Sequence, residues 1–224
     1  MTVSYQLGTI TVRADGLDDT KAKQYVAQVL GMLRGLDSTQ TGHAVLNGIR
    51  WYKKELLIYP YDGSLGTCNG AAYADWGMFR TKVTFTPYLQ GGAHKTCLSD
   101  GKGAYLAGLS PLELLLHELT HAVRLNAGTF RKGVSQAEEE ELAMLVTNIF
   151  SSETNQTLRT AYDNSTSPIR HDHSGYAAKF YASRRILIEI FHKQHHDFTR
   201  WLARVKAPFN PMRLYFEEVR PPGW

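Results

Sequence analysis

The chain has 224 residues, of which 43% are hydrophobic and 21% charged, with a formal net charge of +4. This composition is typical of a soluble globular protein long enough to bury a core. No apolar run approaches the roughly 20 residues that cross a bilayer, which excludes a transmembrane helix.

The N-terminal third is predicted to alternate strands and helices. We expect a short strand at residues 9–13, a helix from Asp18 or Asp19 to Leu36, a second helix from Thr41 to about Trp51, and strands at residues 55–60 and 82–87. The glycine-rich residues 61–80 between the last two strands are predicted to be a loop. The 82–87 strand is a candidate to border a cleft by edge pairing, although an ordinary position in a sheet is favoured.

A helix with well-defined ends is predicted from Ser110. Ser110 is a good N-cap, Pro111 suits the first helical position, and Glu113 completes a capping box. Asn126-Ala127-Gly128 offers a stop. Leucines bury most of the remaining surface of this helix.

This helix carries His117-Glu118-Leu119-Thr120-His121, the H-E-x-x-H pattern of zinc peptidases. Residues four apart lie on one helical face, so His117 and His121 can present their imidazoles to one ion. Glu118 then lies beside the metal as a base. The alternative is a pair of core histidines that bind backbone carbonyls, which the flanking residues make less favoured.

A third metal ligand is expected in the acidic run at residues 138–141, which opens the next helix. The spacing after His121 lacks the glycine and histidine of the metzincin pattern, because Arg124 and Ala127 stand there. A glutamate 17 to 20 residues after His121 is the gluzincin arrangement, and all four carboxylates lie in that window. The helix dipole favours acidic residues at the helix N-terminus, which accounts for part of this run without any metal.

These residues resemble zinc metallopeptidases of secreted bacterial effectors. His117-Glu118-Leu119-Thr120-His121-Ala122 followed by Glu139-Glu140-Glu141-Leu142-Ala143 is similar to the NleD-like family and to peptidase domains fused to VgrG-type spike proteins of type VI secretion. The resemblance covers mainly residues 105–175. It implies an α+β, zincin-like fold with an active-site helix, a second ligand-bearing helix and a small sheet.

The resemblance also implies particular site residues. A Glu-x-x-Ala step marks the third Zn²⁺ ligand, which falls on Glu140, while Glu139 and Glu141 stay open as alternatives. An Arg-x-Asp-His step at residues 170–173 makes Arg170, His173 and also Tyr176 candidates to stabilise the tetrahedral oxyanion. Asp172 is instead a candidate to orient a ligand histidine, and a purely structural role fits this segment equally well.

The C-terminal part is predicted to form one long helix from Gly175 to just before Pro208. His192 and His196 lie four residues apart in it, but the absence of a suitably spaced carboxylate disfavours a second metal site. Residues 157–224 carry 11 Lys or Arg against 6 Asp or Glu, which we interpret as a solvated face. We expect one domain over residues 1–224, with a core at about 35–206 and an irregular tail at 207–224.

The sequence thus predicts a zinc endopeptidase with Glu118 as the base that activates water. The alternatives are a non-catalytic zinc-stabilised fold and a binding module with a basic surface. The N-terminus lacks the features of a signal peptide, so we expect export by a specialised system and action in a target cell. Expected partners are a protein substrate, a secretion carrier or an immunity protein, and no nucleic acid. Cys68 and Cys97 can be paired or free.

Overall fold

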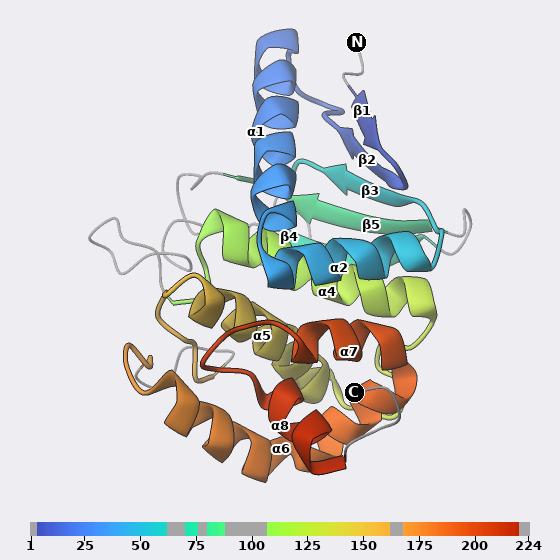
Figure 1. The fold of residues 1–224 in the computed structure, drawn as a ribbon. Helices are drawn as coiled ribbons and strands as arrows, with labels where there is room; N and C mark the ends of the chain where they lie inside the picture. The colour runs from blue at the N-terminus through green and yellow to red at the C-terminus, as the bar shows by residue number, and fades with distance from the viewer. Residues whose placement is uncertain (1–3, 62–69, 76–79, 88–106, 162–167, 220–224) are drawn as a thin grey trace.

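A five-stranded sheet lies against layers of helices in the computed structural model, which describes residues 4–61, 70–75, 80–87, 107–161 and 168–219 (Figure 1). The fold is mixed α+β, as predicted. The strands are β1 (Ser4–Leu7), β2 (Ile10–Arg13), β3 (Leu56–Tyr59), β4 (Gly70–Asp75) and β5 (Arg80–Phe85). Their order is β1-β2-β3-β5-β4, with β2, β3 and β5 parallel and the two outer strands antiparallel to their neighbours.

Each predicted N-terminal helix and the Ser110 helix is present. The helices are α1 (Asp19–Asp37), α2 (Gln40–Trp51), α4 (Pro111–Ala127), α5 (Gln136–Glu153), α6 (His173–Gln194), α7 (His196–Ala203) and α8 (Pro211–Val219). Side-chain caps explain where several of them begin, since Asp18, Thr39 and Ser110 accept hydrogen bonds from backbone N–H groups in the first turns. No helix in the described part of the chain is both long and apolar enough to span a bilayer.

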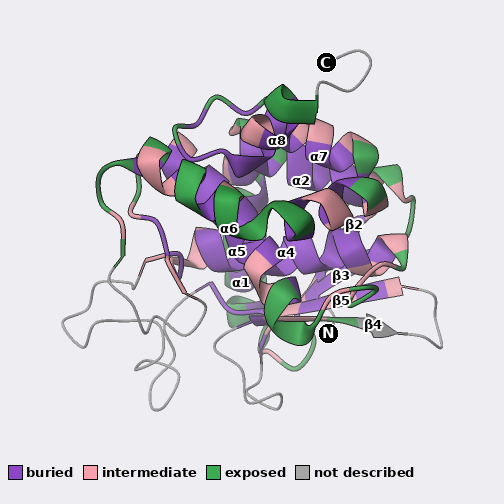
Figure 2. Ribbon diagram, turned by 90° about the horizontal axis from the view of Figure 1, so that it is seen from below, coloured by how far each residue is buried: buried purple, intermediate pink, exposed green. Residues whose placement is uncertain are grey.

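Helix α4 is the central element of the molecule. It packs against β4 and β5 on one side, against α5 on another, and alongside α2. Figure 2 shows that α4 and α5 are buried along most of their length, whereas the outward faces of α6 and α8 are exposed. A helix buried on several sides is held rigidly, which suits an element that positions functional side chains.

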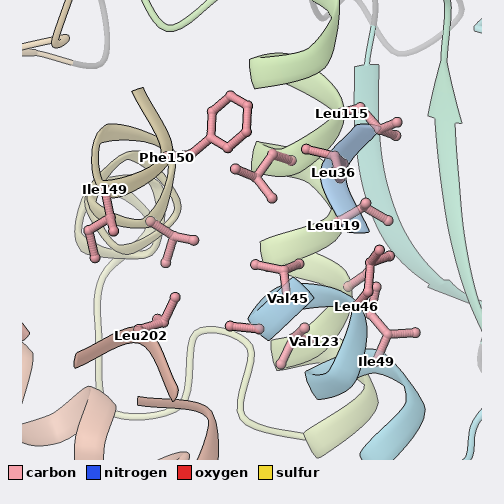
Figure 3. Close-up of a cluster of buried hydrophobic side chains, with 14 of the residues drawn as sticks. Leu36, Val45, Leu46, Ile49, Leu115, Leu119, Val123, Ile149, Phe150 and Leu202 are labelled. Carbon is pink, nitrogen blue, oxygen red and sulfur yellow. The ribbon is translucent and has the colours of Figure 1, made fainter. Parts of the chain in front are cut away.

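The core around α4 draws apolar side chains from five helices. Figure 3 shows these side chains gathered between the helices, and the labelled ones are Leu36, Val45, Leu46, Ile49, Leu115, Leu119, Val123, Ile149, Phe150 and Leu202. Each is nearly or completely buried. Burying one such side chain stabilises the fold by about 1.5–3 kcal/mol before the loss of entropy is counted.

One of our predictions about the sheet is wrong, because residues 70–75 form strand β4 rather than loop. Strand β5 lies between β3 and β4, which is the ordinary position in the sheet that we favoured over an edge. Gly70-Ala71-Ala72 has low intrinsic strand propensity, which is why the pattern indicated a loop. Glycine at position 70 suits the packing, because a Cβ atom there would lie 3.1 Å from the Cγ atom of Glu118.

Two predictions about the C-terminal part are also corrected. The expected long helix is broken at His195, whose φ of −141° and ψ of 55° separate α6 from α7. The tail is not irregular, because residues 211–219 form α8, which packs on α6 and α7. Both differences arise from tertiary contacts: His195 is buried between Tyr52 and Thr129, and α8 buries Met212 and Phe216.

Candidate metal centre

His117 and His121 lie one turn apart in the middle of α4, on the same buried face. Their exposed fractions are 6% and 4%, and their Nε2 atoms are 3.2 Å apart. The predicted capping box is present, since Ser110 accepts from the N–H of Glu113 while the Glu113 carboxylate accepts from the N–H of Ser110. The start of the helix is therefore set by its own residues, and with it the direction in which both imidazoles point.

Glu140 of α5 completes a compact set of three ligand atoms. Its Oε2 atom lies 3.0 Å from Nε2 of His117 and 3.3 Å from Nε2 of His121. Ligands bound about 2.0–2.1 Å from a tetrahedral Zn²⁺ are roughly 3.3 Å from one another. The three atoms thus form a triangle of the size that zinc requires.

The donor set also fits zinc chemically. Two imidazole nitrogens and one carboxylate oxygen are typical zinc ligands, and three protein ligands leave a position open. Among the described residues, His117, His121 and Glu140 are the one group of three or more potential ligands close enough to hold an ion. These residues match the predicted triad. His192 and His196 are not joined by a third ligand in that part of the chain, and Nδ1 of His192 is hydrogen-bonded to Thr199.

The neighbours of Glu140 in the acidic run have other partners. The Glu138 carboxylate accepts from the N–H of Ser135 at the N-terminus of α5, in a second capping box. Glu141 accepts two hydrogen bonds from Arg184, at 2.6 and 2.9 Å. The run therefore needs no shared cation to relieve repulsion among all four carboxylates. Of the four, Glu140 is the one whose carboxylate lies within 3.3 Å of both imidazoles.

Glu139 lies behind the site and is completely buried. Its Oε1 atom accepts from Nε of Arg124 at 2.6 Å and faces Nδ1 of His121 at 3.5 Å, while Oε2 accepts from the N–H of Arg131. Burial opposes its charge, but His121 and Arg124 more than offset that effect and lower the pKa of Glu139 to about 2. A carboxylate so placed orients the histidine ring and directs its Nε2 toward the ligand triangle.

The electrostatics of the two histidines differ because of their neighbours. Burial lowers the pKa of His117 to about 4, so its imidazole is neutral and can act as a ligand. Burial also opposes charge on His121, but Glu139 and Glu140 overcome it and raise the pKa of His121 to about 9. The buried Glu139 and the partly buried Glu140 thus favour a positive charge on His121.

Glu118 follows His117 on α4 and is 7% exposed. The edge strand β4 passes directly over it: a Cβ atom on Gly70 would lie 3.1 Å from Cγ and 3.3 Å from Oε1 of Glu118. Burial raises the pKa of Glu118 to about 7, against the opposing effect of His121. Sequence reasoning missed Gly70, and its place in a glycine-rich segment gave no signal of this contact.

Two of the predicted oxyanion donors, His173 and Tyr176, contact residues other than the triad. Arg170 is exposed, the ring of His173 is hydrogen-bonded to Ser152, and Tyr176 stacks on Phe209 with ring centroids 5.3 Å apart. Ser152 is 12 residues beyond Glu140 on α5, which corresponds to about 18 Å along the helix axis. The geometry therefore gives no support to His173 as a donor at the metal.

Arg159 is a charged residue near the site that sequence reasoning missed. It is 7% exposed, and its charge contributes to lowering the pKa of His117. The side-chain amide of Asn148 on α5 binds the backbone of Arg159 twice: its oxygen accepts from the Arg159 N–H, and its NH₂ donates to the Arg159 carbonyl. No spacing rule links residue 159 to the histidines, because the connection is made by the turn after α5.

The basic C-terminal part is partly neutralised by ion pairs. Arg184 pairs with Glu141, Arg185 with Glu218, and Lys193 with Glu189. These pairs favour the solvated face over a basic docking surface. Cys68 and Cys97 lie outside the described residues.

Comparison of the chain with protein-family models, curated proteins and solved structures finds no match. What bears on function is therefore the arrangement of the chain's own residues.

Proposed function

We propose that this chain is a zinc-dependent endopeptidase of the zincin type. The observation that carries the proposal is the triangle formed by His117, His121 and Glu140, with a buried carboxylate, Glu118, next to the first ligand on the same helix. The ligand triangle alone would suit a structural metal. The added acid beside it indicates catalysis.

Zinc held by this triad would supply a Lewis acid that polarises a peptide carbonyl and acidifies a water molecule. Glu118 would take the proton from the attacking water and return it to the leaving amine. Glu139 would keep His121 in one tautomer during these steps. Because Glu118 is buried and β4 passes over it, its carboxylate has little freedom to turn away.

The edge strand supports a peptide as the substrate. Among the described residues β4 is the outer strand, paired with β5 on one side only. An extended peptide can add to such a strand through backbone hydrogen bonds, which would bring its scissile bond alongside Glu118. We further propose, from the resemblance to secreted effectors, that the enzyme is delivered by a specialised secretion system and acts on a protein of the target cell.

The test is a comparison of zinc content and peptidase activity in matched variants. We expect about one zinc per chain in the wild type and in Glu118→Gln, with activity on unfolded proteins or a peptide library lowered by about 10²–10⁴ in the variant. Glu140→Gln should lose both zinc and activity. Glu138→Gln, which alters an exposed cap on the same helix, is the control and should keep both.

Two outcomes would contradict the proposal. Equal activity in Glu118→Gln and wild type would leave only a structural role for the metal. Failure of the folded wild-type chain to take up zinc would remove the metal centre itself.

A further inference from the structure

We propose that a small cavity between α2 and α7 binds an alkylammonium group. The cavity has a volume of about 100 Å³ and is lined by residues from the end of α2 and the start of α7. Its walls include four aromatic side chains and one carboxylate, and these are Trp51, Tyr52, Phe198, Trp201 and Asp197. It is a different site from the metal triad and does not depend on the proposed peptidase activity.

The two tryptophans form a corner. Their ring centroids are 6.0 Å apart and the ring planes meet at 81°. Trp51 is 59% exposed, an unusual state for so large an apolar side chain. The two indoles meet edge to face, and both side chains line the cavity. Aromatic rings around a small space can hold a quaternary ammonium group, because the π-face of a ring carries partial negative charge.

The charges around the cavity also favour a cation. Asp197 lies one turn before Trp201 on α7 and contributes the carboxylate. The cavity is at the C-terminus of the 12-residue helix α2, whose dipole adds partial negative charge, and at the N-terminus of the 8-residue helix α7, whose dipole opposes it. Arg50, the basic residue nearest in sequence to Trp51, is turned away and donates to Asn47 and pairs with Asp37.

The histidines that line the cavity do not reverse this balance. His195 is buried, and burial with the charge of Arg124 lowers its pKa to about 3, so the ring is neutral. His196 lies with Nδ1 3.7 Å from the Asp197 carboxylate. A ligand ammonium would add to that arrangement from the cavity side, between the indoles and the carboxylate.

Two sources of such a group fit the cavity: a choline headgroup and a methylated lysine side chain. We would titrate both, as choline and as a trimethyllysine peptide, at pH 8 while following the indole N–H resonances by NMR. Trp51→Phe and Trp201→Phe assign the signals. We expect the N–H resonances of both indoles to shift with saturation. The probe that binds with the lower Kd identifies the source of the ammonium group.

An uncharged ligand and substituted proteins serve as controls, and they distinguish a cation-binding site from an apolar cavity. The uncharged choline isostere 3,3-dimethylbutan-1-ol should cause no comparable shift. Trp51→Ala should weaken binding about five- to thirtyfold, and Asp197→Asn about two- to fivefold. Ile186→Ala removes an exposed apolar side chain elsewhere on the surface and should leave binding unchanged.

The proposal is overturned by either of two results. One is the absence of saturable shifts with both ammonium probes in the folded protein. The other is an equal response to the neutral isostere, which would show an apolar pocket with no preference for charge. Thermal unfolding of Trp51→Ala, whose side chain is largely exposed, verifies that lost binding is not lost folding.

Discussion

At the scale of single residues, the acidic run at 138–141 shows how four adjacent carboxylates acquire four separate roles. One caps a helix, one pairs with Arg124, one faces the histidines and one binds Arg184. Successive residues on a helix point about 100° apart, so neighbours in sequence meet different surroundings. Glu139 and Glu140 differ by one position, yet only Glu140 reaches the ligand triangle.

Glu139→Gln should weaken zinc binding by about 10- to 100-fold, because His121 loses the carboxylate that orients its ring. Competition with a chromophoric chelator measures this affinity. The same variant leaves the buried charge of Arg124 without its partner and should lower stability. Glu138→Gln is the matched control on the neighbouring residue, and equal zinc affinities in the two variants would show that Glu139 has no positioning role.

His195 should make the protein sensitive to mild acid. Its ring binds Tyr52 and Thr129 and is held neutral by burial and by Arg124, with Glu139 opposing, so that its pKa falls to about 3. The unfolded chain takes up this proton near pH 6.5, whereas the folded chain does so only near pH 3. The free energy of unfolding therefore decreases as the pH falls from 6.5 towards 3.

Urea unfolding at several pH values between 7.5 and 5.5 tests this linkage. His195→Gln should be less stable than wild type at pH 7.5 but should lose less stability as the pH falls. The comparison isolates His195 from the other histidines, which are present in both proteins. If the free energy of unfolding changed equally with pH in the two proteins, His195 would not be the source of the acid sensitivity.

At the scale of elements, the junction of α1 and α2 depends on a glycine in close contact. A Cβ atom at Gly42 would lie 2.2 Å from the carbonyl oxygen of Leu36, at the end of the preceding helix. The start of α2 is also held by α5, since the Glu153 carboxylate accepts from the N–H groups of Gln40 and Thr41. The turn between α1 and α2 is thus tied to the ligand-bearing helix.

Gly42→Ala should destabilise the fold by about 1–3 kcal/mol or more, because the backbone of Leu36 cannot move aside cheaply. Gly31→Ala in α1 is the matched control: no atom lies within 4 Å of its new Cβ. That variant should be stabilised by about 0.5–1 kcal/mol through helix propensity alone. Chemical denaturation measures the change in the free energy of unfolding in each variant. Destabilisation by both substitutions would contradict the packing argument.

At the scale of the whole molecule, the C-terminal segment completes the core on the side away from the sheet. Phe209 packs against Tyr176 and Phe180, and its N–H donates to Ser152 of α5. Helix α8 then buries Met212 and Phe216 against α6 and α7. Residues near the end of the chain thus support the helix that carries Glu140.

Phe216→Ala should lower the free energy of unfolding by about 3–5 kcal/mol, since it empties a fully buried site. Val219→Ala on the same helix is the control, because Val219 is 39% exposed and should cost little. Thermal unfolding monitored by circular dichroism compares the stabilities of the two variants. A small effect in both would mean that α8 is not part of the cooperative core.

Elements whose signals lie within a few residues could be predicted from the sequence. Ser110, Pro111 and Glu113 mark the start of α4, and the four-residue spacing puts His117 and His121 on one face; both follow from backbone geometry within a few residues. The resemblance marked Glu140 as the third ligand with Glu139 and Glu141 left open, and the tertiary contacts show that Glu140 is the one beside both histidines. Tertiary contacts also fix which strand forms the edge and where the C-terminal helix breaks. Glu140, Gly70 and His195 are each placed by contacts with chain segments far away in sequence, and such contacts leave no periodic pattern to detect.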